Sequence, residues 1–368
     1  KHLCTDGHQA PSATITGSLT MTSKVKSAIR QIRSLSMPFS TPEPFLFCVY
    51  HKDDYPAGDE KMQAPKTGNG HDFNPKAKYR MYHGEKVPGF PQHPHRGFET
   101  ITATIEGIID HTDSMKCGGR YGQGDLQWMT AGKGVVHAEM FPLVNADKPN
   151  PTRFFQIWLN LPKKNKMVNP DYIMHWAEDV KKFASKDEKT KITVWAGELD
   201  EVKALEPPKN SWAADPENDV AVWHIEVAPG GKYTLPKAKG GSGINRTFYF
   251  IEGKHLEIEN QTIDPSSRVD VNAGMEVELS VPKSASRSAE LLMLQGKPIG
   301  EPVAQHGPFV MNSQAEIMQA FMDYQRTQFG GWPWPNNDHV FPREKGRFSK
   351  KGKKTEYPPK RQEEKQSP

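Results

Sequence analysis

Two short segments of the chain carry pairs of side chains that are suited to bind a metal ion. The first segment contains His93 and His95, and the second, about forty residues later, contains His137 and Glu139. Residues two apart in a β-strand point to the same face, so each pair presents both side chains on one side of its strand. If the two strands lie on opposing parts of a barrel wall, three imidazoles and one carboxylate meet in the barrel interior.

Imidazole and carboxylate ligands without a thiolate suit Fe, Mn, Ni, Cu or Zn. Four such ligands leave two positions open on a six-coordinate ion, as non-haem iron oxygenases require, whereas zinc prefers four-coordination and would be nearly saturated. The alternative is that His-Pro-His belongs to a surface loop and that the strand histidines are core groups with hydrogen-bond partners. Both pairs have strand spacing and both follow a glycine turn, which favours the metal site.

Short β-branched segments between glycine-containing turns must position these residues. The chain has 30 glycines and 31 prolines, and short strands at regular spacing are typical of a sandwich or barrel. The segments are Thr100–Ile105, Gly107–His111, Leu126–Thr130, Val135–Met140 and Phe154–Leu161, and strands resume after residue 190. The sequence therefore predicts an all-β fold.

A weak internal repeat predicts two similar halves. The residues Thr104-Ile-Glu-Gly107 reappear as Phe250-Ile-Glu-Gly253, which predicts one barrel over residues 41–162 and another over residues 190–312. Gly124-Asp125 has a counterpart in Gly274-Met275. Carrying His93 and His95 over by the first offset, and His137 and Glu139 by the second, reaches Lys239, Gly241, Arg287 and Ala289. None of these four is an ordinary metal ligand, so we expect a second barrel without metal.

The remaining segments are expected to be a helix, a linker and two polar extensions. Residues 313–330 have a helical period with Ile317, Ala320, Phe321 and Tyr324 on one face. Residues 163–189 are predicted to be a charged linker with a short helix around 172–183. Residues 331–368 are predicted to be a basic, disordered tail.

Residues 1–40 are rich in Ser, Thr, Lys and Arg and contain one acidic residue, Asp6. This composition is typical of an organelle transit peptide, and the alternative is a disordered extension.

Composition excludes several classes of function. The formal net charge is only +4 and the basic excess lies at the ends of the chain, so we expect no nucleic-acid binding surface on the body. The three cysteines are too few and too scattered for a disulfide framework or a structural zinc site. Apolar stretches are too short to span a membrane. We expect a monomer.

The metal-binding segments resemble the signature of pirins, a branch of the cupin superfamily. The matching runs are His-Pro-His-Arg-Gly-Phe-Glu-Thr from His93 and Gly-Asp-Leu-Gln-Trp-Met-Thr-Ala-Gly-Lys-Gly-Val-Val-His-Ala-Glu-Met from Gly124, with further matches at 156–162 and 306–312. The resemblance covers roughly residues 42–330. It implies two stacked cupin barrels (double-stranded β-helices) with a C-terminal helix, and a cytoplasmic or nuclear location. It also implies one iron ion, Fe(II) or Fe(III), on His93, His95, His137 and Glu139.

The chain departs from the pirin pattern in three places. The loop at residues 51–86 is much longer than usual, and the tail beyond Gly330 is extended. Residues 47–50 lack the acidic residue that often follows the Pro-Phe-Leu run, which is residues 44–46 in this chain. The long loop immediately precedes the metal motif. The way in which a substrate reaches the metal therefore cannot be inferred from other pirins.

Glu99 is the second carboxylate of interest. It has the same parity as His93 and His95, and many cupins use a carboxylate at this position as a ligand. With Glu139 in the ligand role, Glu99 is free to act as a base or to hydrogen-bond a metal-bound water. The alternative is a structural carboxylate held by Arg96 or a backbone donor.

Two functions are compatible with this site. The resemblance implies a dioxygenase that uses O2 to cleave a flavonol such as quercetin, with Glu99 or Glu139 accepting the hydroxyl proton. The alternative is a non-catalytic iron or redox sensor that binds transcription-related or metabolic partner proteins. A cavity large enough for a three-ring flavonol beside the ion favours catalysis, whereas a small closed cavity favours sensing.

Overall fold

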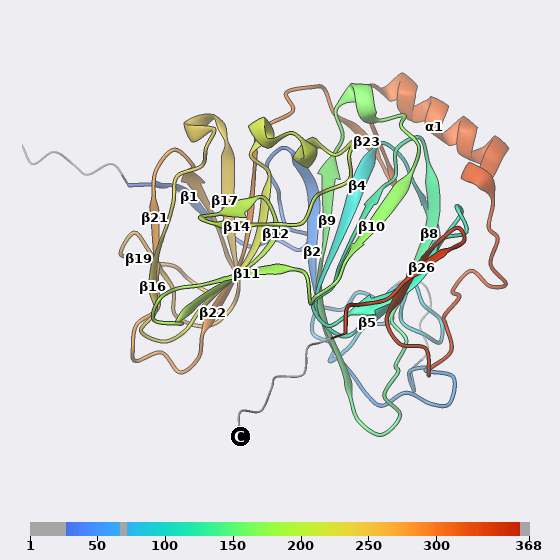
Figure 1. Cartoon of the computed structure of the whole chain (residues 1–368), viewed down its shortest axis with the longest axis horizontal. Coiled ribbons are helices and arrows are strands. Elements are labelled where there is room, and N and C mark those ends of the chain that lie inside the picture. Colours follow the sequence, from blue (N-terminus) through green and yellow to red (C-terminus); the bar gives the residue numbers. More distant parts are fainter. Residues whose placement is uncertain (1–26, 67–71, 361–368) are drawn as a thin grey trace, which may run out of the picture.

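The computed structural model describes residues 27–66 and 72–360, which form two β-barrels lying side by side (Figure 1). The first barrel has a five-stranded sheet in the order β10 (Asp171–His175), β7 (Leu126–Thr130), β4 (Phe98–Glu106), β9 (Asn150–Asn160) and β2 (Phe45–Tyr55). Its six-stranded sheet has the order β26 (Lys354–Glu356), β25 (Phe348–Lys351), β6 (Gly118–Gly122), β5 (Ile108–Asp113), β8 (Val135–Met140) and β3 (Gly89–His95).

The second barrel has a seven-stranded and a four-stranded sheet. The larger has the order β1 (Ile29–Ser34), β20 (Ser267–Asn272), β17 (Asn245–Glu252), β22 (Ala289–Gly296), β15 (Ala221–Val227), β12 (Thr190–Ala196) and β11 (Lys181–Ala184). The smaller has the order β16 (Lys232–Leu235), β21 (Val277–Ser280), β18 (Glu257–Ile258) and β19 (Gln261–Thr262). Two short hairpins are β13 (Glu198–Leu199) with β14 (Val202–Lys203) and β23 (Ala304–His306) with β24 (Phe309–Met311). The prediction of an all-β fold with two barrels is confirmed.

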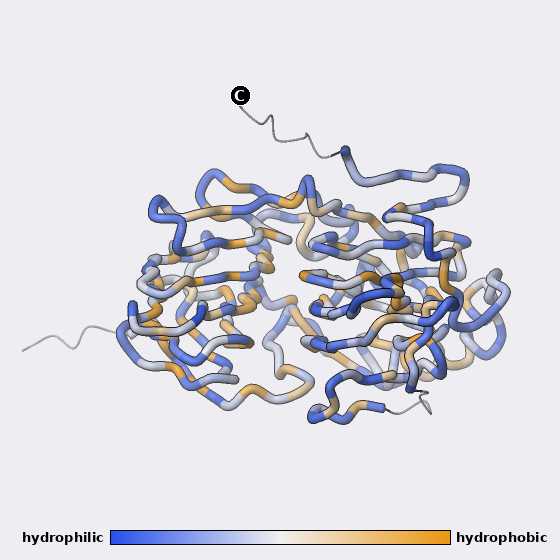
Figure 2. Tube along the Cα trace, turned by 90° about the horizontal axis from the view of Figure 1, so that it is seen from below, coloured by the Kyte–Doolittle hydropathy of each residue, from blue (hydrophilic) through white to orange (hydrophobic). Residues whose placement is uncertain are grey.

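Alternation along the strands divides the side chains of the first barrel between two environments. On β4, Ile101 and Ala103 join a buried cluster that also contains Trp195 and Leu292 of the second barrel. The intervening Thr102 points into the first barrel, where its hydroxyl contacts Glu139. The five-stranded sheet therefore has one face toward the second barrel and the other toward the candidate site. Short hydrophobic segments are interspersed with hydrophilic ones throughout both barrels (Figure 2).

The predicted C-terminal helix is confirmed as α1 (Gln314–Thr327). The hydroxyl of Ser313 caps its N-terminus by accepting a hydrogen bond from the Glu316 amide, and Ile317 and Ala320 are buried. The helix packs beside the first barrel (Figure 1), next to the hairpin of β23 and β24. None of the helices in residues 27–66 and 72–360 is long and apolar enough to cross a membrane.

The predicted helix around residues 172–183 is wrong. Residues 171–175 form β10, which pairs with β7 of the first barrel, and residues 181–184 form β11, which pairs with β12 of the second. The linker thus adds one strand to each barrel. Pairing of β10 with the distant β7 and of β11 with the adjacent β12 outweighed the local preference of this charged segment for helix.

The prediction of a disordered tail is wrong for residues 331–360. Strand β25 pairs with β6 and extends the six-stranded sheet of the first barrel. Arg120 is 2% exposed and forms an ion pair with Asp110. It holds the segment before β25 by donating hydrogen bonds to the carbonyls of Phe341, Pro342 and Lys345. The tail is therefore anchored through its backbone, which its basic composition does not indicate.

The prediction for residues 1–40 is also wrong in part. Strand β1 pairs with β20, so the N-terminal segment begins in the second barrel before the chain enters the first. Residues 1–26, on which the targeting prediction rests, lie outside the described residues.

Candidate metal centre

Three of the four predicted ligands converge in the first barrel. One nitrogen from each of His93, His95 and His137 lies within 4.8 Å of the others. The Nε2 atoms of His93 and His137 are 3.0 Å apart. His137 is fully buried and His95 is 3% exposed.

The two ligand pairs lie on neighbouring strands, not on opposing parts of the wall as expected. Strands β3 and β8 are antiparallel partners with His93 directly opposite His137, and the register shifts between Phe90 and His93. Opposite residues in such a pair have their side chains on the same face. Direct cross-strand pairing therefore brings the imidazoles together.

The protonation of the three histidines fits a cation between them. Burial lowers the pKa of His93 to about 4 and lowers the pKa values of His95 and His137 well below the usual range. Nδ1 of His93 lies 2.9 Å from the Pro91 carbonyl oxygen, so it carries the proton and leaves a lone pair on Nε2. That lone pair faces Nε2 of His137, and a metal ion between the two nitrogens would bind both of them.

Glu139 lies beside the three histidines and is 4% exposed. Its Oε2 atom is 3.9 Å from Nε2 of His137 and accepts a 2.8 Å hydrogen bond from the Gln156 amide. Its Oε1 atom lies 3.0 Å from the Thr102 hydroxyl. Burial raises the pKa of this carboxyl, while hydrogen bonds from Thr102 and Gln156 favour its ionised form. This geometry suits an oriented fourth ligand or a proton acceptor.

Glu99 does not face the site, so that expectation is wrong. Its Oε2 atom accepts a 2.5 Å hydrogen bond from Ser211 and its Oε1 atom a 2.7 Å bond from Thr130. Glu99 is fully buried on the side of β4 that faces the second barrel, and burial raises its pKa to about 7. The alternative partner Arg96 instead forms an ion pair with Asp323.

Glu99 does not share a face with His93 and His95, because the chain passes from one sheet to the other between β3 and β4. Strand β3 belongs to the six-stranded sheet and β4 to the five-stranded sheet. The turn passes through Gly97 at φ +87°, where an added Cβ would lie 1.9 Å from the Val310 carbonyl oxygen. Alternation holds only within a continuous strand, so it does not carry across this turn.

A cavity of about 690 Å³ opens onto His93, His95 and Glu139. Its lining is mainly apolar and aromatic. Besides the metal-binding side chains, the lining includes Phe47, Val49, His51, Phe73, Pro75, Arg80, Tyr82, Phe90, Phe141, Phe154, Gln156 and Trp158. The long loop after β2 supplies Phe73, Pro75, Arg80 and Tyr82, so the feature that departs from the pirin pattern forms one wall of the cavity.

Two histidines near the site escaped the sequence analysis. His111 is fully buried, its ring centroid lies 5.5 Å from that of His137, and its Nε2 lies 3.1 Å from Asp113 Oδ2. His51 lines the cavity on β2, which extends to Tyr55, so His51 lies in a strand and not in the expected loop at residues 51–86. In both cases the available signal was continued alternation of side chains along a strand.

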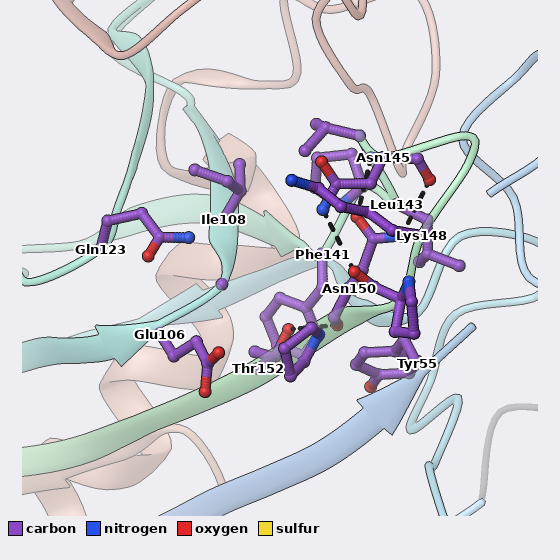
Figure 3. A pocket seen from close by; sticks show the side chains of 15 residues that line it. Tyr55, Glu106, Ile108, Gln123, Phe141, Leu143, Asn145, Lys148, Asn150 and Thr152 are labelled. Atoms are coloured by element: carbon purple, nitrogen blue, oxygen red, sulfur yellow. Dashed lines mark hydrogen bonds between the residues drawn. The ribbon is translucent and has the colours of Figure 1, made fainter. Parts of the chain in front are cut away.

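A second cavity, of about 460 Å³, lies where the loop after β8 approaches β5 and β9 (Figure 3). Glu106 and Gln123 lie on one side of it, and Asn145 and Lys148 lie on the other. Its lining contains one carboxylate and no histidine or cysteine. It therefore offers no set of metal ligands, although Phe141 lines both cavities.

Comparison with known proteins gives consistent matches over both barrels. A family model described as Pirin matches residues 41–159, and one described as Pirin C-terminal cupin domain matches residues 222–330. A pirin-like protein from Caulobacter vibrioides is 37% identical over 241 residues, covering 66% of this chain and 80% of the relative. Human pirin is 34% identical over 262 residues, covering 70% and 83%. A crystal structure of quercetin 2,3-dioxygenase from Acinetobacter baumannii superposes with a TM-score of 0.62 at 29% identity, covering 78% and 87%.

Proposed function

Because the chain belongs to the pirin family of the cupin superfamily, we propose that its first barrel is a mononuclear non-haem iron dioxygenase that cleaves a flavonol such as quercetin. His93, His95, His137 and Glu139 would hold the ion. When bound, iron would supply Lewis acidity and coordination sites for O2 and for the chelating hydroxyl and carbonyl oxygens of a flavonol.

The size and lining of the cavity carry this proposal. Its volume of about 690 Å³ falls within the range of ~300–1,000 Å³ that is typical of sites for ligands of this size. The apolar and aromatic walls suit a flat three-ring molecule, and His93, His95 and Glu139 supply polar groups at the metal end. A non-catalytic sensor requires no such cavity, so the catalytic role is favoured over sensing. The Acinetobacter baumannii relative named quercetin 2,3-dioxygenase supports the same substrate class.

Within this site Glu139 would accept the proton of the flavonol hydroxyl. It lines the cavity beside the histidines, and a carboxylate in that position can act as a general base. Gln156 and Thr102 would hold the carboxylate in place. The aromatic walls would exclude water and orient the substrate plane. Glu99 has no part in this scheme because both of its oxygens are engaged outside the cavity.

The test is turnover by protein loaded with iron under anaerobic conditions, with metal content confirmed by elemental analysis. On adding quercetin and O2 we expect loss of flavonol absorbance, oxygen uptake and release of carbon monoxide in equal amounts. Protein loaded with zinc serves as the matched control, because zinc has no redox chemistry. Full iron loading without oxygen uptake or flavonol loss would refute the proposal.

A further inference from the structure

His51 is a polar side chain in the apolar wall of the metal cavity. It lies on β2 in alternation with Phe47 and Val49, and all three line the cavity. The residue is 5% exposed. Its ring stacks on Phe154 at a centroid distance of 4.4 Å and contacts Tyr82 edge-on at 4.9 Å.

The imidazole of His51 has no hydrogen-bond partner among residues 27–66 and 72–360. Burial, followed by the charge of Arg80, lowers its pKa to about 3, so the ring is neutral and has one donor and one acceptor nitrogen. Neither ring nitrogen of His51 is among the buried polar atoms that lack a partner, so the nitrogens keep access to the cavity. Phenylalanine would make the same ring contacts without placing polar nitrogens at the cavity, so packing alone does not account for histidine here.

The neighbouring carboxylate is already used by other groups. Asp53 follows His51 on the same face of β2, and its Oδ1 accepts a 2.8 Å hydrogen bond from Nε of Arg80. Its Oδ2 accepts a 2.7 Å bond from the Tyr82 hydroxyl. Asp53 therefore fixes the loop after β2 against the barrel and leaves the nitrogens of His51 available to a molecule in the cavity.

We propose that His51 is a specificity-determining residue, whose imidazole hydrogen-bonds a hydroxyl of a polyhydroxylated, planar aromatic ligand with its chelating edge at the metal centre. The assignment rests on the proposed function for the orientation of the ligand. It predicts a preference within one ring skeleton: ligands with hydroxyls remote from the chelating edge bind more tightly than ligands without them. Such selectivity arises because a buried polar group is left unpaired by the deoxygenated ligand.

The test compares quercetin with 3-hydroxyflavone, which keeps the chelating edge and lacks the other hydroxyls. Dissociation constants are measured under nitrogen on zinc-loaded, full-length protein by quenching of tryptophan fluorescence, since Trp158 lines the cavity. His51→Phe keeps the ring and removes its nitrogens, whereas His51→Gln keeps a donor and an acceptor. His83→Phe is the control, because His83 contacts Phe73 and Phe90 in the same aromatic cluster but is outside the lining.

We expect His51→Phe to raise the dissociation constant of quercetin about five- to tenfold, the worth of one hydrogen bond. In the same variant the dissociation constant of 3-hydroxyflavone should change less than about twofold. The His51→Gln variant should keep part of the preference for quercetin. Equal effects on both ligands, or none on either, would overturn the assignment. Wild-type protein that binds neither flavonol would overturn both the assignment and the proposed function. If the protein binds quercetin selectively but the iron-loaded protein does not turn it over, the dioxygenase proposal is overturned and the role of His51 in ligand selection is supported.

Discussion

The buried carboxyl of Glu99 should cause the protein to lose stability as the pH rises toward neutrality. Its pKa is raised from 4.5 to about 7 by burial, although Ser211 and Thr130 donate hydrogen bonds that oppose the shift. Between these values the folded protein keeps the proton and the unfolded chain releases it, so a higher pH favours unfolding. The stabilisation is complete below about pH 4.5 and is lost as the pH rises through about 7.

The size of this effect follows from the shift. At ~1.36 kcal/mol for each pKa unit, the change from 4.5 to about 7 corresponds to about 3 kcal/mol of unfolding free energy. Glu99→Gln is nearly isosteric and cannot ionise, and the hydroxyls of Ser211 and Thr130 can turn to accept from its amide. The variant should therefore gain about 2–3 kcal/mol on the wild type between pH 5 and pH 8.

The assay is urea unfolding of wild type and Glu99→Gln at matched metal content over that pH range. Subtracting the two curves removes the contributions of all other titrating groups. Glu206→Gln, which removes an exposed glutamate, is the control for loss of one charge. A constant difference between wild type and Glu99→Gln across the range would refute the reasoning.

Two further outcomes test the ligands and the tail. His137→Ala should remove most of the metal, measured by elemental analysis. His175 is a buried histidine that contacts the Glu206 carbonyl, and the control His175→Ala should retain the metal. Metal retained by His137→Ala would contradict the proposed set of ligands. Arg120→Ala should cost about 3–5 kcal/mol in urea unfolding, because it leaves Asp110 charged and buried, and should expose residues 331–360 to limited proteolysis. A protected tail in that variant would contradict the anchoring role of Arg120.

Spacing within single strands predicted the part of the site that depends on local geometry. His93 and His95 lie on one strand, and His137 and Glu139 on another, and alternation placed each pair correctly on one face. The pairing of His93 with His137 depends on strand register, which involves residues more than forty positions apart. Strand spacing alone could not reveal that register, and the expected opposing walls were therefore neighbouring strands.

The linker and tail were misjudged for a related reason. Strands β10, β11 and β25 are charged or only partly buried, so their composition carries little periodic signal. β10 and β25 are held by backbone hydrogen bonds to distant strands, and β11 is held by those to the following strand, β12. In the tail, Arg120 also binds main-chain carbonyls, which are the same in every sequence. Such contacts are set by tertiary structure and leave no pattern in the segment itself.

The loop after β2 shows why recognising a metal motif does not by itself establish a substrate. Its polar composition correctly indicated a loop, yet Tyr82 and Arg80 from that loop enclose the cavity because Asp53 binds both. The three histidines would be shared by any protein with this motif, whereas His51 and the aromatic wall depend on β2 and on a loop that is longer than is usual in the family. The metal motif therefore determines which ion chemistry is available, and the selection among aromatic ligands depends on β2 and its following loop.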